Sequence, residues 1–287
     1  MRLAVLAAAL LLGGAAPAPR PAEVASPVTL GQGYRLQSTV LGEERRINVV
    51  LPPGYAKDPK RRYPVLYLID GGVDQDLLHI AGVAQLGAIW GRSQPVILVG
   101  IETRDRRKEL VGPTRDPELL KRYPTAGHSA DFREFIAREV KPLVARHYRT
   151  SGRDAVIGES LAGLFITETY LIAPTLFGAY AAIDPSLWWD KEALSLRARA
   201  LLSGAQKGRP FYLAIASEQA GEPAAAERVL AAMRAAGATV CEQRRPDLTH
   251  ATIYQQVAPT ALQYVLPPQS APGAEYGFTV RCAGAVD

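Results

Sequence analysis

The sequence predicts an α/β domain in which helices cover both faces of a mainly parallel sheet. Short, wholly apolar runs such as Val65–Ile69 and Phe211–Ala216 are typical of strands that are buried on both faces. Segments with helical spacing lie between these runs, and such alternation indicates parallel strands that are joined by helices. The length of 287 residues suffices for one large domain or two small ones.

Two strands are expected before the alternation begins. Tyr34–Leu41 and Arg45–Leu51 read as strands that are joined by a turn at Gly42 and Glu43, and the second one stops at Pro52. The strands expected after them are Val65–Ile69, Pro95–Ile101, Ala155–Ile157, Ala179–Ile183, Phe211–Ala216 and Ala238–Gln243.

Three helices can be placed from their spacing and end signals. Ser129 is expected to be the N-cap of a helix whose apolar face holds Phe132, Phe135, Ile136, Val140, Leu143 and Val144. Ala224–Ala236 is rich in strong helix formers and is followed by Gly237, which favours a helix end. Pro259–Val265 is expected to be the last helix.

The N-terminus has the layout of a secretory signal peptide. Arg2 precedes an unbroken apolar run, Leu3–Leu12, and small residues and prolines follow up to Ala25. The run is about half the roughly 20 residues that span a bilayer as a helix; an uncleaved anchor is the alternative. We therefore expect a signal peptide at residues 1–25, a catalytic domain at 26–266, a tail at 267–287 and export to the periplasm or beyond.

Cysteine and charge patterns limit the partners. Cys241 and Cys282 are expected to form a disulfide in an exported protein, with two inert thiols as the alternative. Neither cysteine belongs to a CxxC pair, so no metal or other cofactor is expected. The net charge of +5 is scattered rather than clustered, and no nucleic-acid partner is expected.

A candidate nucleophile follows the expected strand Ala155–Ile157. Ser160 lies between a strand and a helix, and a tight strand–turn–helix needs small residues two positions before and after the serine. Gly158 and Ala162 meet that need, although Ala162 departs from the strict G-x-S-x-G pattern. The alternative is a serine that only caps the helix of an ordinary turn.

A serine nucleophile also needs donors for the developing oxyanion. The N–H of Leu161, the residue after the serine, is one candidate. The second is the N–H of Gly72, which lies in the loop after Val65–Ile69. The alternative for Gly72 is a plain turn that needs glycine for its backbone shape.

The expected chain order of such a site is serine, acid, histidine. Of the four histidines, only His250 follows Ser160 and the last strands, and it is expected in a loop just before a helix. Glu218 follows the expected strand Phe211–Ala216 and is the first candidate for the acid. Asp184 and then Glu222 are its rivals, and a site without an acid is a further alternative.

These residues resemble the esterase branch of the α/β-hydrolase superfamily, which includes siderophore esterases, feruloyl esterases, S-formylglutathione hydrolases and mycolyltransferases. The likeness runs from about residue 45 to 266, and it is greatest with the siderophore-esterase-like subgroup. It is carried by the segments 65–71, 157–165 and 185–189, which read VLYLIDG, IGESLAGLF and PSLWW. Two residues depart from the family: Ala162 stands in place of a usual glycine, and Asp184 in place of a usual small polar residue.

The resemblance implies an α/β-hydrolase fold and a catalytic pair, Ser160 and His250. Trp188 and Trp189 are expected near the site mouth, where aromatic rings could stack on a substrate, with a core position for at least one of them as the alternative. We therefore expect a serine esterase that acts on a small-molecule ester through an acyl-enzyme. An acyltransferase and a non-catalytic binding protein of the same fold are the alternatives. The ester itself and the oligomeric state are not apparent from the sequence.

Overall fold

The computed structural model describes residues 25–217 and 223–283. The signal peptide expected at residues 1–25 therefore lies almost wholly outside the described residues. The helices and strands belong to a unit that begins at Gly31, and residues 25–30 form neither.

One eight-stranded sheet organises this unit, in the order β1-β2-β4-β3-β5-β6-β7-β8. β2 is antiparallel to both β1 and β4, and all other neighbours are parallel. This confirms the mainly parallel sheet that the apolar runs predict. The strands are β1 (Gln32–Gln37), β2 (Glu44–Val50), β3 (Tyr63–Ile69), β4 (Ile97–Ile101), β5 (Thr150–Glu159), β6 (Tyr180–Ile183), β7 (Pro210–Ala216) and β8 (Thr239–Arg245).

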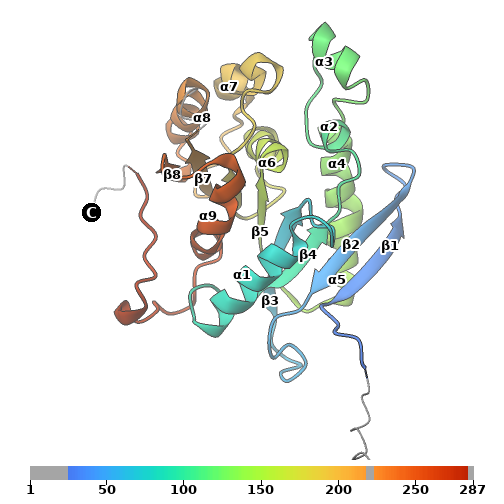
Figure 1. The fold of residues 1–287 in the computed structure, drawn as a ribbon, viewed down its shortest axis with the longest axis vertical. Helices are drawn as coiled ribbons and strands as arrows, with labels where there is room; N and C mark the ends of the chain where they lie inside the picture. The colour runs from blue at the N-terminus through green and yellow to red at the C-terminus, as the bar shows by residue number, and fades with distance from the viewer. Residues whose placement is uncertain (1–24, 218–222, 284–287) are drawn as a thin grey trace, which may run out of the picture. The chain divides into compact units, whose positions relative to one another are not determined.

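Helices cover both faces of the sheet (Figure 1). α1 (Leu77–Ile89) and α9 (His250–Val265) pack together on one face. The other face carries α4 (Ser129–Phe135), α5 (Lys141–His147), α6 (Leu161–Ile172), α7 (Trp189–Leu201) and α8 (Pro223–Ala235). Residues along β3 alternate between the two cores: Tyr67 packs on one face, and Leu66 and Leu68 pack on the other. Two short helices, α2 (Arg106–Glu109) and α3 (Pro117–Arg122), follow β4.

Two expected helices have different bounds from those predicted. The helix expected from Ser129 is α4, a π-helical turn at Ile136–Val140 and then α5, and its N-cap is His128 rather than Ser129. The hydroxyl of Ser129 instead donates to Glu168. The last helix begins at His250, nine positions before Pro259, because Thr249 and Thr252 form a capping box there.

A disulfide joins Cys241 of β8 to Cys282, which confirms the predicted pair. The tail also bridges Glu242 through Ala283, and Gln263 of α9 donates to the carbonyl of Phe278. These contacts tie the tail to the domain. Within residues 25–217 and 223–283, no helix has the length and apolar character that crossing a membrane requires.

Candidate active site

Ser160 stands at a sharp turn between β5 and α6. Its backbone has φ 62° and ψ −120°, an unfavourable conformation for a residue with a side chain. The turn is held because Ser160 N–H donates to Ile183 O at 3.0 Å, and Ser160 O accepts from Leu164 N–H at 2.9 Å. Its hydroxyl lies 3.3 Å from the hydroxyl of Ser186. This geometry presents the serine at the carboxyl end of the sheet.

The neighbours of Ser160 are small for steric reasons. A Cβ on Gly158 would lie 2.7 Å from the Cβ of Ala162. A Cβ on Gly163 would lie 3.0 Å from the carbonyl oxygen of Ile183. The turn therefore tolerates alanine at position 162 because position 158 is glycine.

His250 is the first residue of α9 rather than part of the loop expected before it, and its ring pairs with a buried carboxylate. Nδ1 of His250 lies 2.5 Å from Oδ2 of Asp184, whose side chain is fully buried. Asp184 directly follows β6, and its Oδ1 accepts from the N–H of Ala216 at 2.8 Å. The Asp184 N–H donates to Ala214 O at 2.8 Å, so the acid is anchored to β7 at both its main chain and its side chain.

The two other candidate acids, Glu218 and Glu222, lie outside the described residues. The structure thus brings the histidine together with Asp184, the second-ranked candidate from the sequence. Its signal was its position directly after a buried strand, which is the same signal that favoured Glu218.

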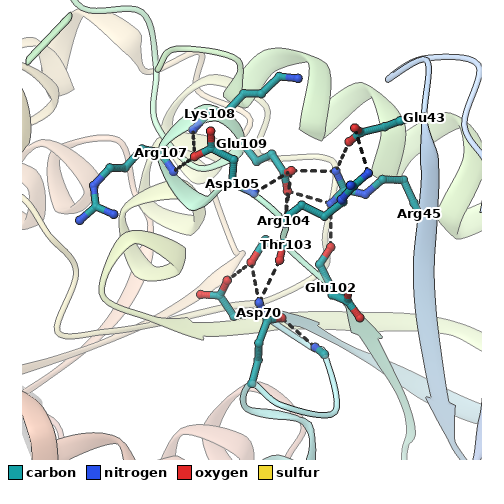
Figure 2. A network of polar contacts seen from close by, with 12 residues as sticks. Glu43, Arg45, Asp70, Glu102, Thr103, Arg104, Asp105, Arg107, Lys108 and Glu109 are labelled. Carbon is teal, nitrogen blue, oxygen red and sulfur yellow. Dashed lines mark hydrogen bonds and ion pairs between the residues drawn. The ribbon is translucent and has the colours of Figure 1, made fainter. Parts of the chain in front are cut away.

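The loop after β3 borders the serine turn. Leu68 of β3 is paired with Ile157 of β5, so two positions further along each strand lie Asp70 and Glu159. Asp70 has φ 59°, and its carboxylate accepts from Thr103 and from Arg106. These loops belong to a polar network in which Arg45 lies between Glu43 and Glu109, with Thr103 beside Asp70 (Figure 2).

The two residues expected to donate to the oxyanion lie on different elements, Leu161 in α6 and Gly72 in the loop after β3. Leu161 opens α6 immediately after the serine. The N–H of Gly72 donates to Oε1 of Gln75 at 2.9 Å. Sequence reasoning did not anticipate this contact, because a glutamine three residues away in a turn gives no distinctive pattern.

Three ionisable groups that influence one another electrostatically have raised pKa values, and one of them, Glu159, directly precedes Ser160. Burial is the main cause that raises the pKa of Glu159 to about 7, opposed by His250 and reinforced by Asp76. Burial, with help from Asp70, raises the pKa of Asp76 to about 6. Tyr254 is also buried, which raises its pKa. In the part of the chain that the structure describes, no cluster of three metal-ligating side chains is present.

The two tryptophans differ in exposure. Trp188 is 46% exposed, and Trp189 is buried at 5%. Their ring centroids are 6.1 Å apart. Trp189 lines a cavity of about 900 Å³ between α3, α4, α6 and α7, together with Leu164, Arg115 and Arg197. Trp189 therefore packs in the core, which is the alternative stated for one of the two tryptophans, while Trp188 is partly exposed.

A mainly parallel sheet in this order, with a serine on a strained turn between β5 and α6, defines an α/β-hydrolase fold. The family model described as Putative esterase matches residues 38–247, so the chain belongs to that esterase family.

Relatives and solved structures agree with this membership. Ferri-bacillibactin esterase BesA of Bacillus subtilis is 29% identical over 180 residues, which are 56% of this chain and 60% of BesA. The siderophore enterobactin esterase of Emericella nidulans is 34% identical over 96 residues, 32% of each chain. The chain thus matches less than two thirds of the length of either relative. The crystal structure of an IroE-like serine hydrolase from Shewanella oneidensis matches with a TM-score of 0.69 and 26% identity, covering 80% of this chain and 77% of that one.

Proposed function

We propose that this protein hydrolyses carboxylic esters, with Ser160 as nucleophile, His250 as general base and Asp184 as the acid. The observation that carries the proposal is the pairing of His250 with the fully buried Asp184 at the strand ends that flank the serine turn. A carboxylate on Nδ1 holds the imidazole in the tautomer whose Nε2 can accept a proton.

The proposed reaction begins when Ser160 Oγ attacks the ester carbonyl carbon. His250 takes the serine proton and gives it to the leaving alcohol when the ester bond breaks, which leaves an acyl-enzyme. Water then attacks the acyl carbon, again with His250 as base, and releases the acid and the free serine. The N–H groups of Leu161 and Gly72 are proposed to bind the oxyanion in both steps.

We infer a small-molecule ester as the substrate. The names of the relatives support an ester of a siderophore. Trp188 is partly exposed and follows by two residues Ser186, whose hydroxyl lies 3.3 Å from that of Ser160, which supports a substrate with an aromatic part. We also propose that the protein acts outside the cytoplasm, since the Cys241–Cys282 disulfide suits an oxidising compartment.

The test compares wild type with Ser160→Ala on a short p-nitrophenyl ester and on a catecholate siderophore ester. We expect wild type to turn over and the variant to lose roughly a million-fold in kcat, with an unchanged circular dichroism spectrum. A fluorophosphonate should label wild type at Ser160. Substantial turnover by clean Ser160→Ala protein would reject the nucleophile, and an inactive, unlabelled wild type would reject the function.

A further inference from the structure

The side chain of Gln75 accepts a hydrogen bond from the N–H of Gly72, which is the group that is proposed to donate to the oxyanion. Oε1 of Gln75 lies 2.9 Å from Gly72 N, at ordinary hydrogen-bond distance. A Cβ placed on Gly72 would lie 2.8 Å from the same oxygen, so the carboxamide sits tightly against this residue. Gly72 itself is buried in the loop.

The orientation of the Gln75 carboxamide is set by its partners. Nε2 of Gln75 donates to the carbonyl oxygen of Thr103 at 2.9 Å and lies 3.2 Å from its hydroxyl. A carbonyl oxygen accepts only, and a backbone N–H donates only. Oε1 must therefore face Gly72, and Nε2 must face Thr103.

The hydroxyl of Thr103 donates to Asp70, which also holds Arg106. The same contacts thus link the loop after β3 to the loop after β4. Gln75 closes the turn that starts at Gly72, because its own N–H donates to Gly72 O at 3.1 Å.

We propose that Gln75 is a gate on the oxyanion hole: its carboxamide oxygen blocks the Gly72 N–H in the resting enzyme and withdraws when the oxyanion forms. The inference rests on the proposed function. One N–H cannot give a full, linear hydrogen bond to two oxygens, so the tetrahedral intermediate must displace Oε1. Gln75 is only half-buried, and Val73 and Asp74 in the same turn are exposed, so the side chain can withdraw into solvent.

The gate has a kinetic signature. The resting enzyme must break the Gly72–Gln75 hydrogen bond before the Gly72 N–H can stabilise the transition state. The free energy needed to break this bond raises the activation barrier and lowers kcat/KM. A variant that lacks the blocking oxygen avoids this loss. The effect belongs to the oxyanions of acylation and deacylation and not to substrate binding, so it should appear in kcat rather than in KM.

Two variants of nearly equal length separate a gate from a structural role. Gln75→Met and Gln75→Glu both lose the donor to Thr103, but methionine vacates Gly72 whereas glutamate puts a stronger, charged acceptor on it. We expect Gln75→Met to raise kcat/KM for p-nitrophenyl acetate roughly three- to ten-fold, with KM little changed. Gln75→Glu should fall below wild type.

Rates are expressed per active serine, which is counted by fluorophosphonate titration. Partial unfolding of a variant then does not lower its measured rate. If Gln75→Met is slower than wild type or equal to it, the gate is rejected. A second measurement needs no variant: the crystal structure of the phosphonyl adduct of wild type should show Gly72 N within 3.2 Å of the phosphonyl oxygen and Gln75 moved away. Retention of the Gly72–Gln75 bond in the adduct would also reject the gate. Failure of the proposed function differs from both results, because wild type would then neither turn over nor be labelled.

Discussion

Asp184 and His250 meet across 66 positions of sequence, with Oδ2 of the aspartate 2.5 Å from Nδ1 of the histidine. The acid follows β6, the strand beside the one that leads to Ser160. One main-chain and one side-chain hydrogen bond hold Asp184 to β7, and the start of α9 positions His250. The acid is therefore anchored to β6 and β7, and the base to the start of α9.

Asp184→Asn should lower kcat by about four orders of magnitude while the fold persists. Asparagine can still accept from Ala216 through its amide oxygen, but its amide N–H then faces His250 Nδ1 and favours the tautomer that protonates Nε2. Steady-state kinetics would measure the loss. Glu218→Gln and the exposed Asp247→Asn are the comparison variants, and each should lose far less. If Glu218→Gln costs more than Asp184→Asn, Glu218 is the acid.

Gly158→Ala should destabilise the protein by about 1–3 kcal/mol, because the new methyl group would press on Ala162. The double variant Gly158→Ala/Ala162→Gly removes the contact with Ala162 and leaves Cδ1 of Ile166 at 3.2 Å, at a cost of about 1 kcal/mol for glycine in a helix. Urea unfolding of the single and double variants measures the coupling. Strictly additive effects of the two substitutions would contradict the steric explanation.

Glu159 should make the protein less stable as the pH rises. Burial raises the pKa of Glu159 from its ordinary 4.5 to about 7 in the folded state. Between these values the unfolded chain loses the proton and the folded chain keeps it, so stability falls from about pH 4.5 and levels off above about pH 7. The difference in free energy of unfolding between Glu159→Gln and wild type should therefore shift in favour of the variant by about 1–2 kcal/mol from pH 4 to pH 8. This range allows for partial solvent screening of the carboxylate.

The measurement for Glu159 is the free energy of unfolding in urea at both pH values. The exposed Glu118→Gln serves as the matched control and should show no such difference. A constant gap between Glu159→Gln and wild type from pH 4 to pH 8 would exclude a raised pKa for this carboxyl group.

Arg45→Leu should lower the free energy of unfolding by about 3–5 kcal/mol, because it leaves the Glu109 carboxylate buried without its charged partner. Both guanidinium nitrogens of Arg45 lie 2.8 Å from the Glu109 carboxylate, and the two side chains are 1% and 4% exposed (Figure 2). The double variant Arg45→Leu/Glu109→Leu leaves no buried charge of this pair and should recover most of the loss. Thermal unfolding of the three proteins tests the pair, and a double variant as unstable as Arg45→Leu would contradict it.

Local pattern predicts the strands well, because a strand that is buried on both faces must be apolar along its length. β5 begins earlier than expected, at Thr150, since Thr150 and Asp154 pair with β3 through the main chain, with a register shift between these two polar positions. The sequence pattern does not reveal α1. Its buried positions have helical spacing, but Leu78, Leu86 and Ile89 on its exposed side blur the pattern.

The site is only partly readable from sequence for a different reason. Steric demands on the serine turn are local, so the small residues around Ser160 reveal it. Which carboxylate pairs with His250 depends on where α9 places the histidine relative to the ends of β6 and β7. The contact of Gln75 with Gly72 depends on the orientation of one side chain. Neither contact produces a recognisable pattern in the sequence.

The Cys241–Cys282 bond closes a covalent ring that contains all of α9 and therefore His250. Both ends of the ring are fixed at β8. The disulfide therefore restricts movement of α9, which carries the proposed base, away from the sheet. A single proteolytic nick inside this ring leaves the two halves of the chain linked through sulfur. In surroundings that keep cysteines reduced, the same nick would release the tail beyond it.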